Sequence, residues 1–487
     1  MTTYDTIIKG GLVAAPGRDL LCDIAISNGR IAALGDGLQG AEVIDAQGLI
    51  VTPGGVDAHC HIDQLTSTGA RTADTFESAS RAAAHGGTTT LMPFAVQHRG
   101  CSLREAVTDY RARMGDTSHV DCAFHLIVTD PTQETLKRDI PDLAAEGFTS
   151  VKIYLSYDAL RLDDRSALDV LAVCRAERLM TMVHAESHDM IAWLTERMVE
   201  HGYDDVRYFP RSRPIVAERD ATHHAIAMSE LIDTPVLIVH VSSIDALDEI
   251  RRAQAGGRPV LAETCPQYLV LADTDLDRPD FGGAKFCCSP PLRDKAHQEA
   301  LWKGLADGTL AVCSSDHSAF FFDGPDGKKR NGDGAPFTRI PYGLPGLEAR
   351  MPLMFSEGVS GGRLSLQTFV EVTATRPAEI YGLGASKGRI APGYDADLVL
   401  WDPLQTARMS VELLHDGIDY TPYEGIDLVG RPVRTLLRGR TLVDGETWMG
   451  GEATGRLLAC ERPVPEDRPR PQNAYYDVTE NRFSDGF

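Results

Sequence analysis

Residues 54–61 read Gly-Gly-Val-Asp-Ala-His-Cys-His, and this stretch decides the fold. An apolar run of strand length ends there in a His-x-His pair. Residues two apart on a strand project from the same face, so His59 and His61 lie side by side. A His-x-His pair alone is a weak signal for a metal site, so the prediction depends on whether other strands also end in ligand-type side chains.

Seven further apolar segments follow, separated by polar stretches of helical length. Stretches such as 167–178 and 244–255 have apolar residues at helical spacing. Repeated strand–helix units predict a (β/α)8 barrel of the TIM type, an α/β fold with buried, parallel strands. The eight strand segments are 54–61, 88–94, 120–128, 149–155, 180–185, 236–241, 260–263 and 310–315.

The two ends of the chain have β character. Short strands are predicted at 7–13, 23–27 and 30–34, and Asn28-Gly29 is a hairpin signal. Strands are predicted again at 388–390 and 396–401, with two more within 431–443. We expect both ends to form one small β-sandwich. The predicted domains are residues 1–52 and 383–455 for the sandwich, 53–382 for the barrel and 456–487 for an extended tail.

Composition excludes several classes of protein. Of the 487 residues, 48 are basic and 70 are acidic, which gives a net charge of −22. This charge argues against nucleic acid or an anionic membrane as a partner. The chain shows no signal peptide and no apolar run of membrane-spanning length, and its ten cysteines are scattered. These features predict a cytoplasmic protein.

Ligand-type side chains recur at the ends of the predicted barrel strands. Lys152 lies in the fourth segment, His184 and His240 end the fifth and sixth, and Asp316 follows the eighth. The carboxyl ends of barrel strands surround one mouth, where active sites form. A lysine in an apolar strand is unusual because a buried ammonium group needs a partner. These four residues, with His59 and His61, predict a metal site at the barrel mouth.

The chain resembles the dihydropyrimidinase/hydantoinase family, the cyclic amidases of the amidohydrolase superfamily. Together the matching motifs are highly specific, although no single one would be. They are residues 54–61, 86–89, Val151-Lys152 with Tyr157, 184–186, 263–269, 288–293, Asp316-His317, 343–348 and 393–398.

The resemblance implies two divalent metal ions, usually zinc. His59, His61 and Asp316 would bind one ion, and His184 and His240 the other. Lys152 would be N6-carboxylated by CO2 and would bridge both, because a carbamate offers anionic oxygens where an ammonium would repel the cations. An ordinary lysine paired with a carboxylate is the alternative for Lys152.

The implied reaction is ring opening of a cyclic amide, a dihydropyrimidine or a 5-substituted hydantoin, to an N-carbamoyl amino acid. A metal-bridging hydroxide would attack the ring carbonyl, with Asp316 as general base and then acid. Tyr157 would stabilise the oxyanion. Backbone groups near Ser289 and Tyr342 would bind the ring. Family members often have asparagine at the position of Tyr342, and the loops after the first and second strands are also unusual, so the substrate stays open.

Three alternatives stay open. The first is an imidase, and the second is an enzyme like allantoinase or dihydroorotase. Allantoinases and dihydroorotases typically carry arginine and Pro-Gly shortly after His-x-His, where this chain has Asp63 and Gln64. A non-catalytic oligomeric scaffold is disfavoured because all six ligand-type residues are present. The resemblance also implies a homo-oligomer, a tetramer or a dimer, that acts on a small-molecule substrate.

Overall fold

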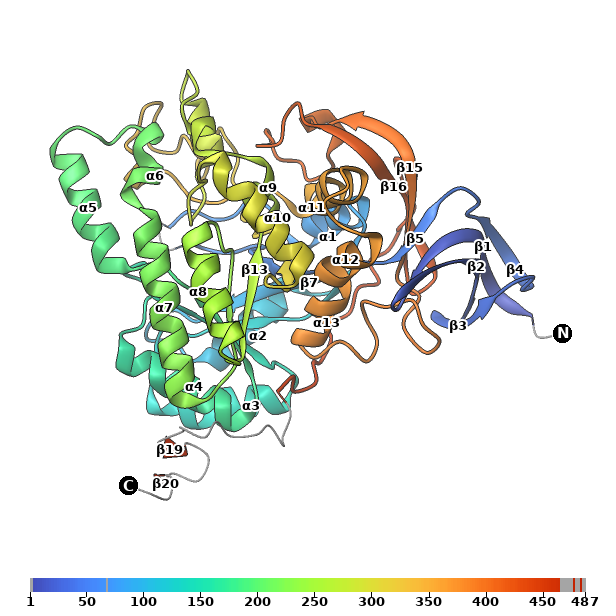
Figure 1. The fold of residues 1–487 in the computed structure, drawn as a ribbon, viewed down its shortest axis with the longest axis horizontal. Coiled ribbons are helices and arrows are strands. Elements are labelled where there is room, and N and C mark those ends of the chain that lie inside the picture. The colour runs from blue at the N-terminus through green and yellow to red at the C-terminus, as the bar shows by residue number, and fades with distance from the viewer. Residues whose placement is uncertain (1–2, 67–68, 465–475, 478–481, 484–487) are drawn as a thin grey trace.

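The computed structural model describes residues 3–66, 69–464, 476–477 and 482–483. Two large sheets organise these residues (Figure 1). One sheet forms the barrel, and the other lies beside it and contains strands from both ends of the chain. No helix in the described ranges is long and apolar enough to cross a bilayer.

The barrel sheet runs in the order β14-β13-β12-β11-β10-β9-β7-β6, with β8 beside β7. Neighbouring strands are parallel, and a parallel bridge between Cys60 and His317 joins the two ends of this order. The predicted (β/α)8 barrel is therefore confirmed, and each predicted segment overlaps a strand. The bounds are β6 Gly55–Cys60, β7 Thr88–Val96, β8 Asp121–Cys122, β9 His125–Ile127, β10 Ser150–Tyr154, β11 Met180–His184, β12 Val236–Ile238, β13 Val260–Thr264 and β14 Val312–Cys313.

Helices surround the barrel sheet (Figure 1). Several begin at a side-chain cap, as α2 does where Ser102 accepts from the backbone N–H of Glu105. The bounds are α1 Phe76–His85, α2 Leu103–Met114, α3 Ile140–Ala145, α4 Asp164–Glu177, α5 His188–Glu200, α6 Phe209–Ser212, α7 Ile215–Ile232, α8 Ile244–Ala255, α9 Pro266–Val270, α10 Gln298–Asp307, α11 Leu347–Leu353, α12 Leu366–Val370 and α13 Arg376–Ile380.

The second sheet joins the two ends of the chain, as predicted. Its order is β18-β17-β16-β15-β5-β1-β2-β3, with β4 beside β1. The link is antiparallel pairing of β15 with β5, which places Leu398 opposite Pro53. The bounds are β1 Tyr4–Ala15, β2 Arg18–Ser27, β3 Arg30–Gly35, β4 Gly40–Asp45, β5 Ile50–Pro53, β15 Leu398–Arg408, β16 Asp427–Leu437, β17 Arg440–Asp444 and β18 Thr447–Trp448.

Two local predictions for this sheet had different outcomes. The Asn28-Gly29 hairpin is confirmed: both residues have positive φ, 51° and 74°, and Ser27 pairs with Arg30. The strand at 388–390 is wrong. Gly388 has a φ of 81°, and its carbonyl accepts a hydrogen bond from Thr375 Oγ1 at 2.7 Å rather than from a neighbouring strand.

The exact domain boundaries stay predictions. In the predicted tail, residues 457–460 lie against the barrel, where the backbone N–H of Leu458 donates to Cys122 and that of Cys460 to Gly147. Residues 465–475, 478–481 and 484–487 lie outside the described residues. Two short strands, β19 Tyr476–Asp477 and β20 Arg482–Phe483, pair antiparallel.

Candidate metal centre

The barrel brings the predicted site residues to one cavity at the carboxyl ends of its strands. The cavity has a volume of about 550 Å³. Eight of the nine predicted residues line it, and the ninth, His59, is fully buried beside them. Those eight are His61, Lys152, Tyr157, His184, His240, Ser289, Asp316 and Tyr342.

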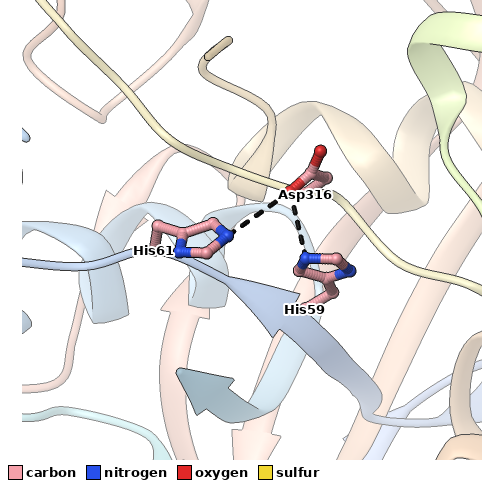
Figure 2. A group of neighbouring side chains, drawn as sticks. All are labelled: His59, His61 and Asp316. Atoms are coloured by element: carbon pink, nitrogen blue, oxygen red, sulfur yellow. Dashed lines mark ion pairs between the residues drawn. The ribbon is translucent and has the colours of Figure 1, made fainter. Parts of the chain in front are cut away.

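His59, His61 and Asp316 form a compact group (Figure 2). Asp316 Oδ1 lies 3.2 Å from His59 Nε2 and 3.6 Å from His61 Nε2. Lys152 Nζ lies 2.6 Å from the same His59 nitrogen. Four potential ligands therefore surround one point at the ends of β6, β10 and β14.

His184 and His240 form a second pair next to Lys152's strand. His184 Nδ1 and His240 Nε2 lie 2.8 Å apart. The rings are nearly perpendicular, with an interplanar angle of 76°, so these two nitrogens face each other across a small gap. His240 Nδ1 is buried and has no hydrogen-bond partner among the described residues.

Three of the histidines have their outward nitrogen held by a polar side chain. Glu263 Oε1 lies 2.6 Å from His59 Nδ1, Gln64 Oε1 lies 2.8 Å from His61 Nδ1, and Glu186 Oε2 lies 2.8 Å from His184 Nε2. An acceptor on one ring nitrogen holds the proton there and leaves a lone pair on the other. Metal-binding histidines show this arrangement, so the donor set fits divalent cations.

Lys152 is buried without a counter-ion. Its side chain is 1% exposed, and in the described part of the chain no carboxylate oxygen lies within 4.0 Å of Nζ. Burial lowers the pKa of Lys152 to about 8, although the charges of Asp316 and Glu263 oppose this shift. The ion pair required by the ordinary-lysine alternative is therefore missing among the described residues.

Burial shifts the pKa values of His61, Asp316 and Tyr157 in the direction that favours their neutral forms. It lowers the pKa of His61 to about 3 and raises the pKa of Asp316 to about 7. Burial also raises the pKa of Tyr157 to about 12, so its hydroxyl keeps its proton and can donate a hydrogen bond. Neutral imidazoles are the form that binds a metal ion.

The backbone is strained at three of the predicted site residues. Tyr157, His240 and Asp316 have φ values of 70°, 42° and 49°, in the left-handed region that non-glycine residues rarely adopt. Such conformations persist only where the surroundings enforce them, and they concentrate at functional sites. Here each directs a side chain from a strand end into the cavity.

Glu186 connects His184 to Arg213 and Ser289 on the substrate side of the cavity. Its carboxylate accepts three hydrogen bonds from Arg213, at 3.0, 3.2 and 2.6 Å, and one from Ser289 Oγ at 2.8 Å. Burial opposes ionisation of Glu186, but Arg213 and His184 outweigh it and lower its pKa well below the usual range. Arg213 also lies over the ring of Tyr157, 5.0 Å from its centroid.

Tyr342 lies on the cavity wall, with its side chain held in place. Its hydroxyl donates to the carbonyl of Phe337 at 3.0 Å, and its ring packs on Phe209 with centroids 4.6 Å apart. The tyrosine thus fills wall space that a smaller residue would leave open.

The outer cavity includes groups that sequence reasoning missed. The loops after β6 and β10 contribute Leu65 and residues 157–160 to the cavity wall. The helix α5 adds a further wall that contains His188, Ile191 and Glu196. Glu263, Gln64 and Glu186 were also missed as histidine partners. Glu263 and Glu186 do lie at or just beyond strand ends, so the search for polar strand ends could have found them.

Comparison with known proteins agrees with this architecture. Residues 50–442 match the Amidohydrolase family. The chain is 41% identical to a D-hydantoinase of Rhizobium radiobacter over 457 residues, which cover 93% of this chain and 98% of that protein.

Two solved structures extend the likeness to the fold. The crystal structure of dihydropyrimidinase from Brevibacillus agri NCHU1002 superposes with a TM-score of 0.91 at 38% identity, covering 94% of this chain and 99% of that one. The structure of L-Hydantoinase (Dihydropyrimidinase) from Arthrobacter aurescens superposes with a TM-score of 0.83 at 25% identity, and the match covers 94% of this chain and 100% of that one. The resemblance seen in the sequence is confirmed, and the chain belongs to the amidohydrolase family.

Proposed function

We propose that this chain opens the ring of a cyclic amide by hydrolysis at a binuclear metal centre. The observation that carries the proposal is the group of four buried or half-buried histidines beside Lys152, which lies 2.6 Å from His59 Nε2. In three of these histidines a polar side chain contacts the ring nitrogen on the side away from the cavity. The similar proteins are named for hydantoins and dihydropyrimidines, so a 5-substituted hydantoin or a dihydropyrimidine is the proposed substrate.

Lys152 would serve as an anionic ligand after reaction with CO2. The neutral amine adds to carbon dioxide and releases a proton, which leaves a carbamate. His59, His61 and Asp316 would hold one ion, and His184 and His240 the other. Nitrogen and oxygen donors suit zinc. When bound, the two ions would make water a strong nucleophile near neutral pH and polarise the ring carbonyl.

The chain's own residues would manage the protons and the developing charge. Asp316 would take a proton from the attacking water and return it to the ring nitrogen when the C–N bond breaks. The Tyr157 hydroxyl would donate a hydrogen bond to the oxyanion that forms on the carbonyl. Water's hydroxyl ends on the carbonyl carbon and its proton on the nitrogen, which gives an N-carbamoyl amino acid from a hydantoin.

A turnover assay tests this function. Zinc-loaded protein with bicarbonate would be incubated with dihydrouracil, 5-phenylhydantoin, allantoin and succinimide, and mass spectrometry would detect the gain of one water. We expect opening of dihydrouracil or the hydantoin, abolished by chelation. Opening of succinimide or allantoin alone would favour an imidase or an allantoinase instead. Two bound metals without any turnover would refute the substrate class.

The remaining features of the proposal concern the protein's setting. We propose a cytoplasmic homo-oligomer, a tetramer or a dimer, as the resemblance implies. Sedimentation at several protein concentrations would measure the assembly. The non-catalytic scaffold is the contrasting function, and metal analysis separates it, because a scaffold has no need of two bound ions.

A further inference from the structure

A second buried lysine, Lys328, lies below the substrate side of the cavity. Its side chain is fully buried, and Nζ donates to three backbone carbonyls: Cys287 at 3.1 Å, Pro341 at 2.7 Å and Gly343 at 2.7 Å. An ammonium group has three hydrogens, so these acceptors use every donor that Lys328 has.

The three carbonyls belong to two segments that lie far apart in the chain. Cys287 comes two residues before Ser289, whereas Pro341 and Gly343 flank Tyr342. The segments also contact each other directly, because the backbone N–H of Gly343 donates to Cys287 at 2.9 Å. Lys328 thus joins the two segments whose backbone we propose to bind the substrate ring.

Two backbone groups next to these anchored carbonyls have no hydrogen-bond partner among the described residues. In the described parts of the chain, no hydrogen bond engages the N–H of Ser289 or the carbonyl of Tyr342. Both residues line the cavity. A ring amide offers one carbonyl acceptor and one N–H donor, which match a free N–H and a free carbonyl if the two are held at a fixed spacing.

A lysine suits this position for electrostatic reasons. Its charge attracts the oxygen ends of three peptide dipoles, and charge-assisted hydrogen bonds are stronger than neutral ones. Burial lowers the pKa of Lys328 to about 8. An apolar side chain at this position would leave the buried carbonyls of Pro341 and Gly343 without a donor, and Cys287 would keep only the N–H of Gly343. The two segments would then separate to reach water.

We propose that Lys328 is a positioning residue, which holds the Ser289 and Tyr342 peptide groups at the spacing that recognises a cyclic amide with a free N–H. This inference rests on the proposed function. It assigns ring recognition to a residue that does not line the cavity, and it predicts a loss in substrate binding and selectivity rather than in chemistry.

The test compares Lys328→Met with Lys329→Met in the full-length, zinc-loaded protein. Lys329 is the matched control, because its amine pairs with Asp323 and Asp333 on the same loop and it is not among the residues that line the cavity. For a ring with a free N–H, we expect KM to rise about tenfold or more in Lys328→Met, with kcat changed less than about threefold. The preference for that ring over its N-methyl analogue should fall about tenfold. Lys329→Met should match the parent chain.

Hydrogen exchange gives a readout that needs no turnover. Peptides that cover 286–292 and 340–346 should exchange faster in Lys328→Met, and peptides from β6 and β10 should not. Unchanged exchange, an unchanged N-methyl preference, or a loss in kcat alone would overturn the inference. If Lys328→Met does not fold, Lys328→Gln, which keeps two donors, should show smaller changes in the same direction. Failure of the parent chain to open any ring would refute the proposed function, while the exchange data would still decide the role of Lys328.

Discussion

Two groups of three ligand-type side chains differ sharply in this molecule. At the barrel mouth, His59, His61 and Asp316 lie together, and between the barrel and the second sheet His85, Glu348 and His415 do the same. In each group the potential ligand atoms lie within 4.8 Å of one another. Composition and proximity alone would make both of them metal sites.

The direction of the ring nitrogens separates the two groups. The rings of His85 and His415 are stacked, with centroids 3.5 Å apart and planes within 7° of parallel. A nitrogen lone pair lies in the plane of its ring, so the lone pairs of two parallel rings cannot meet at one ion. His415 Nδ1 is also bound to Glu348 at 2.8 Å. At the barrel mouth, by contrast, the inward nitrogens converge.

The side chains that contact the ligands from outside the cavity therefore define a metal site as much as the ligands do. Glu263, Gln64 and Glu186 rotate three imidazoles so that their free nitrogens point into the cavity. At the other group, Glu348 holds His415 against His85 instead. We therefore expect matched substitutions in the two groups to have opposite consequences for metal content.

The largest effect is expected from removal of a central ligand. Lys152→Met keeps the apolar stem but removes the nitrogen, and we expect it to lose bound metal and on the order of 10³-fold or more in kcat/KM. His85→Gln should keep full metal content and activity. Elemental analysis after gel filtration, together with the ring-opening assay, measures both. Equal metal loss in the two variants would show that the comparison is wrong.

The next largest effect concerns the oxyanion. Tyr157→Phe removes the hydroxyl and keeps the ring that packs beneath Arg213. We expect kcat to fall by about 10²–10³-fold with metal content unchanged. Steady-state kinetics on the metal-loaded variant provides the measurement, and the role of the hydroxyl would be refuted by a change in KM alone.

A smaller effect is expected from the residues behind the histidines. Glu263→Gln weakens the acceptor behind His59, and we expect metal affinity to fall about 10- to 100-fold. Glu348→Gln makes the same chemical change behind His415 and should leave metal affinity unaltered. Competition with a chromogenic chelator measures both affinities, and similar values for the two variants would contradict the expectation.

The smallest effect is a pH dependence of stability at His85. Burial lowers the pKa of His85 to about 3, so the unfolded chain binds this proton first as the pH falls. The contribution of His85 to the free energy of unfolding is therefore complete above pH 6.5 and is lost progressively as the pH falls to about 3. At pH 5 the free energy of unfolding is lower by about 2 kcal/mol.

His85→Gln should remove this part of the pH dependence. The hydrogen bond to Glu348 raises the pKa of His415, so protonation of His415 stabilises the fold as the pH falls. His415 is present in both the parent chain and His85→Gln. Urea unfolding at pH 7.5 and pH 5 should show a smaller difference in the free energy of unfolding for His85→Gln. Identical differences in the variant and the parent chain would contradict the assignment.

Much of the fold was predictable because it depends on local patterns. The apolar segments that alternate with helical stretches predicted the eight barrel strands, and Asn28-Gly29 predicted its hairpin. The wrong strand at 388–390 shows the limit of such patterns. Within the described ranges no strand pairs with residues 388–390, and the positive φ of Gly388 turns the chain there instead.

Sequence by itself determined which side chains end the barrel strands, and so predicted His59, His61, Lys152, His184 and His240 as neighbours. Only the tertiary structure decided which of the other polar residues serve them. Glu263 is 204 residues from His59, and Lys328 is 41 residues from Cys287. The periodicity of a strand depends on residues that are close together in the sequence. The direction of an imidazole lone pair depends on its contact with a side chain such as Glu263, and that contact exists only once the chain has folded.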